Sequence, residues 1–312
     1  MGGVLNKRQI GSTNVYVTEL GMGGAPLGKV NQQNANTALI ESFSQGIRYF
    51  DTAPLYGAGT SEKFFGQFLS TLTREDFILS TKVGRLIRQT GDEIQITFDY
   101  KRDDILRSIE ESLKRLDMDS IDIVLIHDSD DHYEIALNEA FPALEKLRSE
   151  GVIKAIGAGM NQCEMLVDFA KNADFDCFLI AGRYTLLDHS ALDELMPICV
   201  ERDISLILGG PYNSGILASD LKSDTTYFYD PAPRSVVEKA KKIKEVCDTF
   251  EIPLKAAAIQ FGLMHPSVAS TIPGPRNPDE VQDNINMLKV NIPSELWKEL
   301  KRQGLIHQSC PD

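Results

Sequence analysis

Four titratable side chains, Asp51, Tyr56, Lys82 and His127, follow successive apolar runs of the chain. An unperturbed phenol has a pKa of about 10, and a nearby ammonium group stabilises its ionised form. Lys82 is therefore expected to lower the pKa of Tyr56, and Asp51 to keep Lys82 charged and in place. His127 is suited to hydrogen-bond a substrate oxygen. The set indicates proton transfer at an oxygen whose carbon gains or loses a hydride.

These residues need a scaffold that brings the ends of several strands together. Short apolar runs rich in β-branched residues alternate with helical patterns such as residues 103–116, in which apolar side chains recur every three or four positions. Eight such units favour an α/β fold, a closed (β/α)8 TIM barrel, whose chemistry lies at the carboxyl ends of its strands. The expected strands are residues 18–22, 47–50, 77–81, 121–126, 153–157, 177–180, 205–208 and 268–272.

Further segments lie outside the eight units, and none of them is a linker, so residues 1–312 are expected to form a single barrel domain. Ser294 is expected to cap the last helix. The extra segments are an N-terminal β-hairpin at 7–17 that plugs the bottom of the barrel, a Gly-, Pro- and Tyr-rich stretch at 209–232, two helices at 233–250 and 254–265, and a C-terminal helix at 293–304.

Composition limits the class of partner. The net charge of −13 argues against nucleic acid or an anionic membrane as the main partner. The five cysteines are odd in number and lack a CxxC pair, which favours a reducing compartment, the cytoplasm, over a disulfide framework. No apolar run approaches the roughly 18 residues that a membrane span needs. A small-molecule substrate is the expected partner.

The residues around the four titratable groups resemble the signature of the aldo-keto reductase superfamily. The matching stretches are FDTAPLYG at 50–57, STKV at 80–83, LIH at 125–127, GVIKAIG at 151–157 and IPGPRNP at 272–278, so the resemblance covers nearly the whole chain. It implies the barrel, a nicotinamide cofactor bound without a Rossmann domain, Asp51, Tyr56, Lys82 and His127 as the catalytic tetrad, and a monomer or homodimer.

Finer stretches resemble the aldose 1-dehydrogenase branch, which contains D-threo-aldose (L-fucose), L-galactose and pyridoxal 4-dehydrogenases. They are IHDSDDH at 126–132, AGRYTLLD at 181–188 and GGPYNSG at 209–215. The branch implies oxidation of the anomeric hydroxyl of an aldose of the L-fucose, L-galactose or D-arabinose type to a lactone. Pyridoxal oxidation and general aldehyde reduction are the alternatives. Asp128, Asp130 and Arg183 are candidate contacts to substrate hydroxyls.

The resemblance also implies a cofactor site. Its expected residues are Asn161, Gly209, Tyr212, Gly274, Arg276, Glu280 and Asn284. The helix after residue 274 is expected to direct its N-terminus at the nucleotide phosphates. A carboxylate at Glu280 would repel a 2′-phosphate and accept hydrogen bonds from a ribose hydroxyl, which favours NAD. Arg276 could pair with that phosphate, so NADP remains the alternative.

Three rival interpretations remain. The stretch GMGGAP at 21–26 is similar to a Rossmann turn, but it lacks the third glycine and no helix opens there. The cluster of His127, Asp128, Asp130, Asp131 and His132 contains metal-ligand types, although no HxH follows the first strand; we expect no metal. A regulatory barrel that binds a nicotinamide nucleotide without turnover is a non-enzymatic option.

Overall fold

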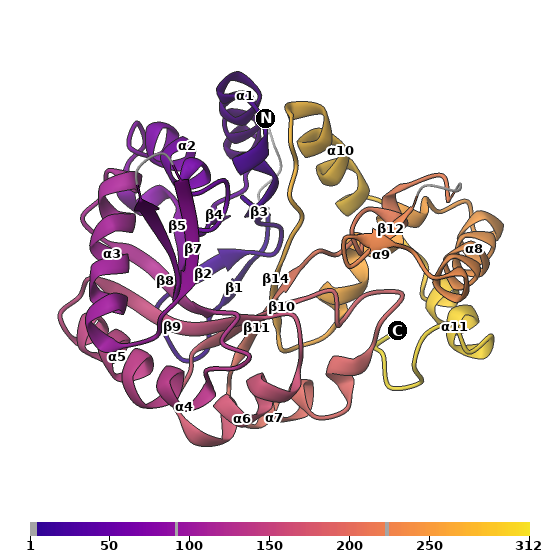
Figure 1. Cartoon of the computed structure of the whole chain (residues 1–312). Coiled ribbons are helices and arrows are strands. Elements are labelled where there is room, and N and C mark those ends of the chain that lie inside the picture. Colours follow the sequence, from indigo (N-terminus) through magenta and orange to yellow (C-terminus); the bar gives the residue numbers. More distant parts are fainter. Residues whose placement is uncertain (1–4, 91–92, 222–224) are drawn as a thin grey trace.

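The computed structural model describes residues 5–90, 93–221 and 225–312. Its main sheet has eight strands in the order β14-β11-β10-β9-β8-β5-β4-β3, and neighbouring strands pair in parallel. The sheet curls until its first and last strands meet, where Leu20 bridges Thr271 and the Gly23 amide donates to the Pro273 carbonyl at 2.9 Å. The predicted (β/α)8 barrel is confirmed (Figure 1). The strands are β3 (Met22–Gly23), β4 (Tyr49–Asp51), β5 (Ile78–Val83), β8 (Ile121–His127), β9 (Ile153–Met160), β10 (Cys177–Ala181), β11 (Ser205–Gly209) and β14 (Val268–Ile272).

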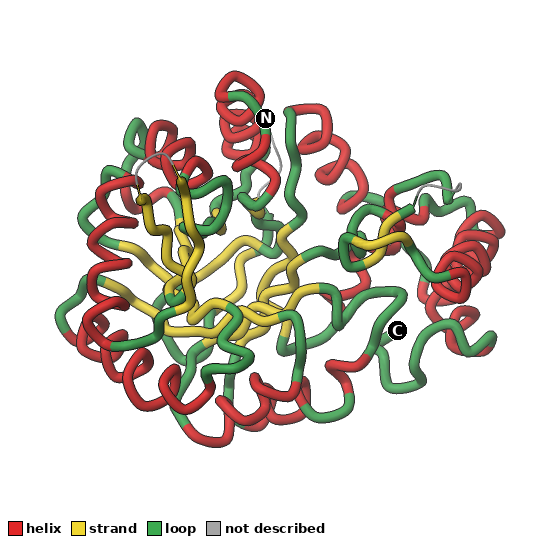
Figure 2. The backbone as a smooth tube through the Cα atoms, viewed as in Figure 1, coloured by secondary structure: helices red, strands yellow, loops and turns green. Residues whose placement is uncertain are grey.

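Helices cover the outside of the sheet (Figure 2). The predicted helix at 103–116 is typical, because its apolar side chains Ile105, Ile109 and Leu116 are buried against the strands. The helices are α1 (Gln32–Ser44), α2 (Thr60–Leu69), α3 (Arg102–Leu116), α4 (Tyr133–Ile135), α5 (Phe141–Ser149), α6 (Glu164–Asn172), α7 (Leu195–Glu201), α8 (Arg234–Thr249), α9 (Leu254–Phe261), α10 (Pro278–Leu288) and α11 (Ser294–Arg302).

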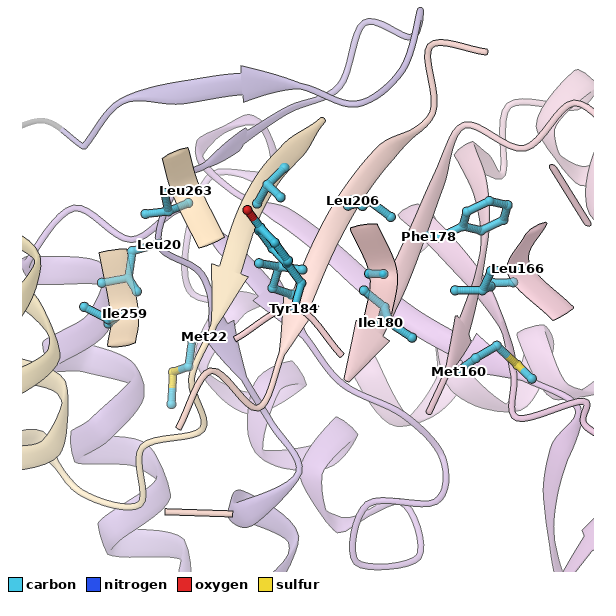
Figure 3. Packing of buried hydrophobic residues seen from close by; sticks show 14 of the residues in the cluster. Leu20, Met22, Met160, Leu166, Phe178, Ile180, Tyr184, Leu206, Ile259 and Leu263 are labelled. Atoms are coloured by element: carbon cyan, nitrogen blue, oxygen red, sulfur yellow. The ribbon is translucent and has the colours of Figure 1, made fainter. Parts of the chain in front are cut away.

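Successive strand residues face opposite sides of the sheet and so build two cores. On β10, Phe178 and Ile180 point outward into the layer between strands and helices, where they pack near Leu166 and Met160 (Figure 3). Leu179 points inward and belongs to the barrel interior. The same alternation decides which polar residues reach the inside of the barrel.

The predicted N-terminal hairpin plugs the bottom of the barrel. Its strands are β1 (Lys7–Gln9) and β2 (Tyr16–Thr18), and Ile10, Val15 and Val17 pack with inward-facing residues of the barrel strands. The expected barrel strand at 18–22 is wrong at its start, because Thr18 pairs with Lys7 in the hairpin.

Two further pairs of antiparallel strands lie in segments that connect elements of the barrel. The ribbon of β6 (Arg85–Thr90) and β7 (Glu93–Phe98), which follows β5, was not predicted. The stretch at 209–232 contains the short pair β12 (Thr226–Tyr227) and β13 (Asp230–Pro231), while its residues 222–224 lie outside the described residues.

Two helix boundaries differ from expectation. Ser294 does not cap α11, because the residue at the cap position is Pro293 and no side chain of the described residues caps the free amides there. The expected helix at 254–265 ends at Phe261 and continues as a 3₁₀ turn, Gly262–Met264. Neither difference touches the carboxyl ends of the strands.

Candidate active site

Three of the four tetrad residues lie on the inner face at the carboxyl ends of β4, β5 and β8. Asp51 ends β4, Lys82 lies near the end of β5, and His127 ends β8. The side chains of Ser80, Ile123 and Leu125 below them share this face, since inward positions recur at every second residue. All three tetrad residues are buried, with 2%, 1% and 7% of their surfaces exposed.

Lys82 is fully engaged in this buried site. Its Nζ donates to both carboxylate oxygens of Asp51, at 2.9 and 2.7 Å, and to the Thr52 carbonyl at 2.9 Å. Burial works to lower the pKa of Lys82, but Asp51 and Tyr56 outweigh it, so the pKa is raised. The amine is therefore held as a charged ammonium.

A second pair of residues holds Asp51, and neither was predicted. The Ser80 hydroxyl donates to Asp51 Oδ1 at 2.7 Å, and the Tyr49 hydroxyl lies 3.0 Å from Ser80 Oγ. Tyr49 is two residues before Asp51 and Ser80 two before Lys82, so both share the inward face. This spacing is the signal that could have identified them.

Tyr56 lies on the loop after β4, where two glycines meet. Gly57 has a φ of +61°, and a Cβ there would lie 2.3 Å from the Gly28 carbonyl oxygen. The close backbone contact accompanies a Tyr56 ring whose centroid lies 4.7 Å from Lys82 Nζ, so the ammonium lies over the face of the phenol ring. The ring also meets His127 edge-to-face, with centroids 6.1 Å apart.

The expected acidification of Tyr56 is wrong in its net direction. Burial raises the pKa of the phenol more than Lys82 lowers it, and Asp51 raises it further, so the pKa of Tyr56 lies above its ordinary value. Lys82 thus acts as predicted but only limits the rise. The phenol is protonated at neutral pH.

His127 is the neutral member of the set. Burial, followed by the charges of Lys82 and Arg85, lowers its pKa well below the ordinary value of a histidine. Its Nδ1 is buried and has no hydrogen-bond partner among the described residues. Its Nε2 lies 3.6 Å from Asp128 Oδ2.

The candidate substrate contacts divide into two groups. Asp128 adjoins the tetrad, and its Oδ1 accepts from Asn161 Nδ2 at 3.2 Å. Arg183 lies beyond Asn161 and donates through Nε to its carbonyl at 2.8 Å. Asp130 is exposed, and among the described residues its side chain accepts a long bond from Gln162, at 3.4 Å, so the structure does not bring it to the tetrad.

The remaining cofactor candidates lie at the ends of β11 and β14 and on α10. Gly209 is buried at the end of β11, and Tyr212 beyond it donates to Asn284 Oδ1 at 2.7 Å. Arg276 and Glu280 form an ion pair at 2.7 Å. Gly274 has little room, because a Cβ there would lie 2.6 Å from Pro26 Cδ.

This set has the donors and acceptors that a dinucleotide needs. Glu280 and Asn284 are four residues apart and so fall on one side of α10, whose first residue is Pro278, and Arg276 on the loop before the helix pairs with Glu280. A guanidinium and a helix N-terminus suit phosphate, a carboxylate suits ribose hydroxyls, and an amide suits a base. The residues present fit a nicotinamide nucleotide.

The metal-ligand types at 127–132 do not gather around one point. Within residues 5–90, 93–221 and 225–312, no three His, Cys, Asp or Glu side chains are arranged to hold a metal ion. Across the same residues, no helix is long and apolar enough to cross a membrane.

Comparisons with known proteins agree with this geometry. A sequence model described as the Aldo/keto reductase family matches residues 19–303. Similar curated proteins include a D-threo-aldose 1-dehydrogenase of Pseudomonas sp, 38% identical over 95% of this chain and 96% of that protein, and a pyridoxal 4-dehydrogenase of Microbacterium luteolum, 35% identical over 96% and 98%. The holo form of an aldo-keto reductase from Bacillus halodurans superposes with a TM-score of 0.82 at 28% identity, covering 99% of this chain and all of that one. The branch expected from the sequence is confirmed.

Proposed function

Because this chain belongs to the aldo/keto reductase family and is an oxidoreductase, we propose that it oxidises the anomeric hydroxyl of a cyclic aldose to a lactone with NAD. One observation carries the proposal: a buried, fully paired Lys82 lies against the Tyr56 phenol, beside a neutral His127. This is an arrangement for moving one proton at one oxygen.

Each tetrad residue has a separate task in the proposed reaction. Tyr56 exchanges the proton of the reacting hydroxyl, and Lys82 stabilises its ionised form. Asp51 keeps Lys82 charged, and His127 hydrogen-bonds the same oxygen. The bound nicotinamide supplies the hydride acceptor. The hydroxyl carbon loses a hydride, its oxygen loses a proton to the phenolate form of Tyr56, which is the minor form at neutral pH and is stabilised by Lys82, and the ring carbon becomes the carbonyl of the lactone.

The carboxylate of Asp128 beside His127 supports a hydroxylated substrate. Asp128 lies within reach of the tetrad, and its carboxylate can accept hydrogen bonds from sugar hydroxyls. The similar D-threo-aldose 1-dehydrogenase supports an aldose of the L-fucose, L-galactose or D-arabinose type. The similar pyridoxal 4-dehydrogenase supports a second candidate, the cyclic hemiacetal of pyridoxal.

The ion pair between Arg276 on the loop before α10 and Glu280 in its first turn supports NAD over NADP. Glu280 binds the Arg276 guanidinium through its side chain and the Arg276 amide through Oε2, at 2.8 Å. Arg276 is then already neutralised by Glu280, and a 2′-phosphate would have to displace the Glu280 carboxylate to pair with the guanidinium. The Asn284 oxygen is taken by Tyr212, which leaves its amide NH2 as the donor to a nucleotide.

A substrate and cofactor panel tests the proposal. Reduced cofactor would be followed with L-fucose, L-galactose, D-arabinose and pyridoxal, each with NAD and with NADP. We expect one aldose with NAD to give the highest kcat/KM. Faster turnover of pyridoxal would replace the aldose, and a clear preference for NADP would overturn the cofactor assignment. Calorimetric binding of NAD without turnover of any compound would support a nucleotide-sensing barrel instead.

A further inference from the structure

The two nitrogens of the His127 ring lie in different surroundings. Nδ1 is buried and has no partner in the part of the chain that the structure describes, whereas Nε2 faces Asp128 Oδ2 at 3.6 Å. A distance of 3.6 Å is too long for a good hydrogen bond, so the contact acts through charge. A neutral imidazole carries one proton, and a carboxylate on one side favours the nitrogen that faces it.

The chain is bent so that this carboxylate turns back on the ring. Asp128 has a left-handed φ of +45°, which is uncommon for a residue other than glycine. The Tyr100 hydroxyl lies within hydrogen-bonding distance of both the His127 and Asp128 carbonyls, at 2.7 and 2.8 Å. Tyr100 follows β7 and is 1% exposed, so a buried phenol holds the bend from outside the barrel strands.

The β6–β7 ribbon also holds the carboxylate itself. Arg85 Nη1 donates to Asp128 Oδ2 at 2.6 Å, and its guanidinium lies 5.0 Å from the centroid of the Phe98 ring. Asn161 Nδ2 binds the other oxygen at 3.2 Å. Both carboxylate oxygens of Asp128 are therefore hydrogen-bonded, one by the ribbon and the other by Asn161. The ribbon thus fixes the position of the carboxylate beside His127.

Asp128 is surrounded by several charged or titratable groups. They are Tyr56 on the loop after β4, Lys82 on β5, Arg85 on β6, Tyr100 after β7, and His127 and Asp130 on its own segment. Arg85 is the cation bonded to the carboxylate, and Lys82 is paired with Asp51. The Arg85–Asp128 pair thus places a negative oxygen next to Nε2 without adding net charge to the pocket.

We propose that Asp128, held by Arg85, is the positioning residue that keeps His127 as the tautomer with its proton on Nε2. The alternative tautomer would place its N–H at Nδ1, which is buried and has no partner among the described residues. It would also leave a lone pair on Nε2 facing a lone pair on Asp128 Oδ2. Both features disfavour it. The Nε2–H tautomer donates a hydrogen bond to the substrate oxygen, a role that rests on the proposed function.

Nitrogen NMR of the enzyme without substrate tests the inference directly. The chain has five histidines, and a His127→Gln variant would assign the resonances of His127. At about pH 8, above the ordinary pKa of histidine, we expect a protonated Nε2 and a bare Nδ1 in the wild type. A wild-type ring protonated on Nδ1 would overturn the proposal, whatever the enzyme oxidises.

Variants of the ribbon separate positioning from folding. Asp128→Asn and Arg85→Gln should each move the His127 tautomer ratio towards Nδ1–H by about tenfold or more, equivalent to one pKa unit of differential interaction. The matched control is Arg88→Gln on the same strand as Arg85, which breaks the pair of Arg88 with Asp104 of α3, at 3.0 Å. It should leave the ratio unchanged. Unchanged ratios in folded Asp128→Asn and Arg85→Gln would refute the proposal.

Kinetics supply a second readout once a substrate is known. In both variants we expect kcat to fall by roughly 10- to 100-fold, less than the full contribution of a general acid–base residue, while KM changes less. Failure of every substrate in the panel would count against the proposed function and leave the NMR test intact. A normal kcat together with a shifted tautomer ratio would contradict the role assigned to the Nε2 proton.

Discussion

Opposing effects meet on the Tyr56 phenol. Burial raises its pKa, Lys82 lowers it, and Asp51, which keeps Lys82 charged, raises it again. The residue types alone predicted the contribution of Lys82 correctly but not the net shift, because the loss of solvent around Tyr56 depends on tertiary packing, such as the close contact of Gly57 with Gly28 on a separate segment. Protonated Tyr56 is suited to donate a proton, so the rate of the reduction reaction should not change with pH around neutrality.

The pH profile of aldehyde reduction checks both shifts. The raised pKa of Tyr56 keeps the phenol protonated at and below its ordinary value of about 10, and the lowered pKa of His127 keeps that ring neutral above about 6.5. We therefore expect kcat/KM for reduction to be flat from about pH 6.5 to about pH 9. A limb inside this range, in a protein whose folding is unchanged, would contradict the assigned protonation states.

The elements that carry the tetrad were predictable because buried parallel strands give continuous apolar runs. The ends of β4, β5 and β8 follow from such runs, and so does the convergence of Asp51, Lys82 and His127. The β6–β7 ribbon was missed because it lies outside the expected barrel pattern and is partly exposed. Its signal is present in the alternation of exposed Ile94, Ile96 and Phe98 with polar residues.

Cofactor choice belongs to α10 and its preceding loop. Glu280→Gln should release Arg276 from the pair and remove the charge that repels a 2′-phosphate. We expect the ratio of kcat/KM with NADP to that with NAD to rise by about tenfold, or about 1.4 kcal/mol. The control is Glu299→Gln on α11, which breaks the similar Arg302–Glu299 pair at 2.5 Å. An unchanged ratio in Glu280→Gln would mean that Glu280 does not determine the choice between NAD and NADP.

At the scale of the whole molecule, the two ends of the barrel have separate tasks. The hairpin fills the bottom with apolar side chains, while the polar residues gather at the carboxyl ends of the strands. The hairpin was predicted from Gly11 and Ser12 between two short strand-like pieces, but the exact start of β3 was not, since Thr18 is compatible with either strand. Stability and catalysis should therefore be separable by substitution.

Ile10→Ala tests this separation. Ile10 is fully buried, so its truncation should destabilise the protein by about 2–5 kcal/mol. The exposed Tyr16 on the same hairpin is the control, because Tyr16→Ala should change stability by only about 0.5 kcal/mol. Urea unfolding measures both. The kcat/KM of the folded Ile10→Ala protein should equal that of the wild type, and a large fall would mean that the plug also shapes the active site.

The activity of Tyr56→Phe, measured together with NAD binding by calorimetry, is the decisive test of Tyr56 as the proton-transfer residue. The substitution removes the phenol oxygen and keeps the ring that packs near Lys82 and His127. We predict that kcat falls by roughly 10²–10⁴-fold, the usual contribution of a positioned acid–base group, while the Kd for NAD stays the same. Turnover at the wild-type rate would contradict the assignment of Tyr56 as the proton-transfer residue.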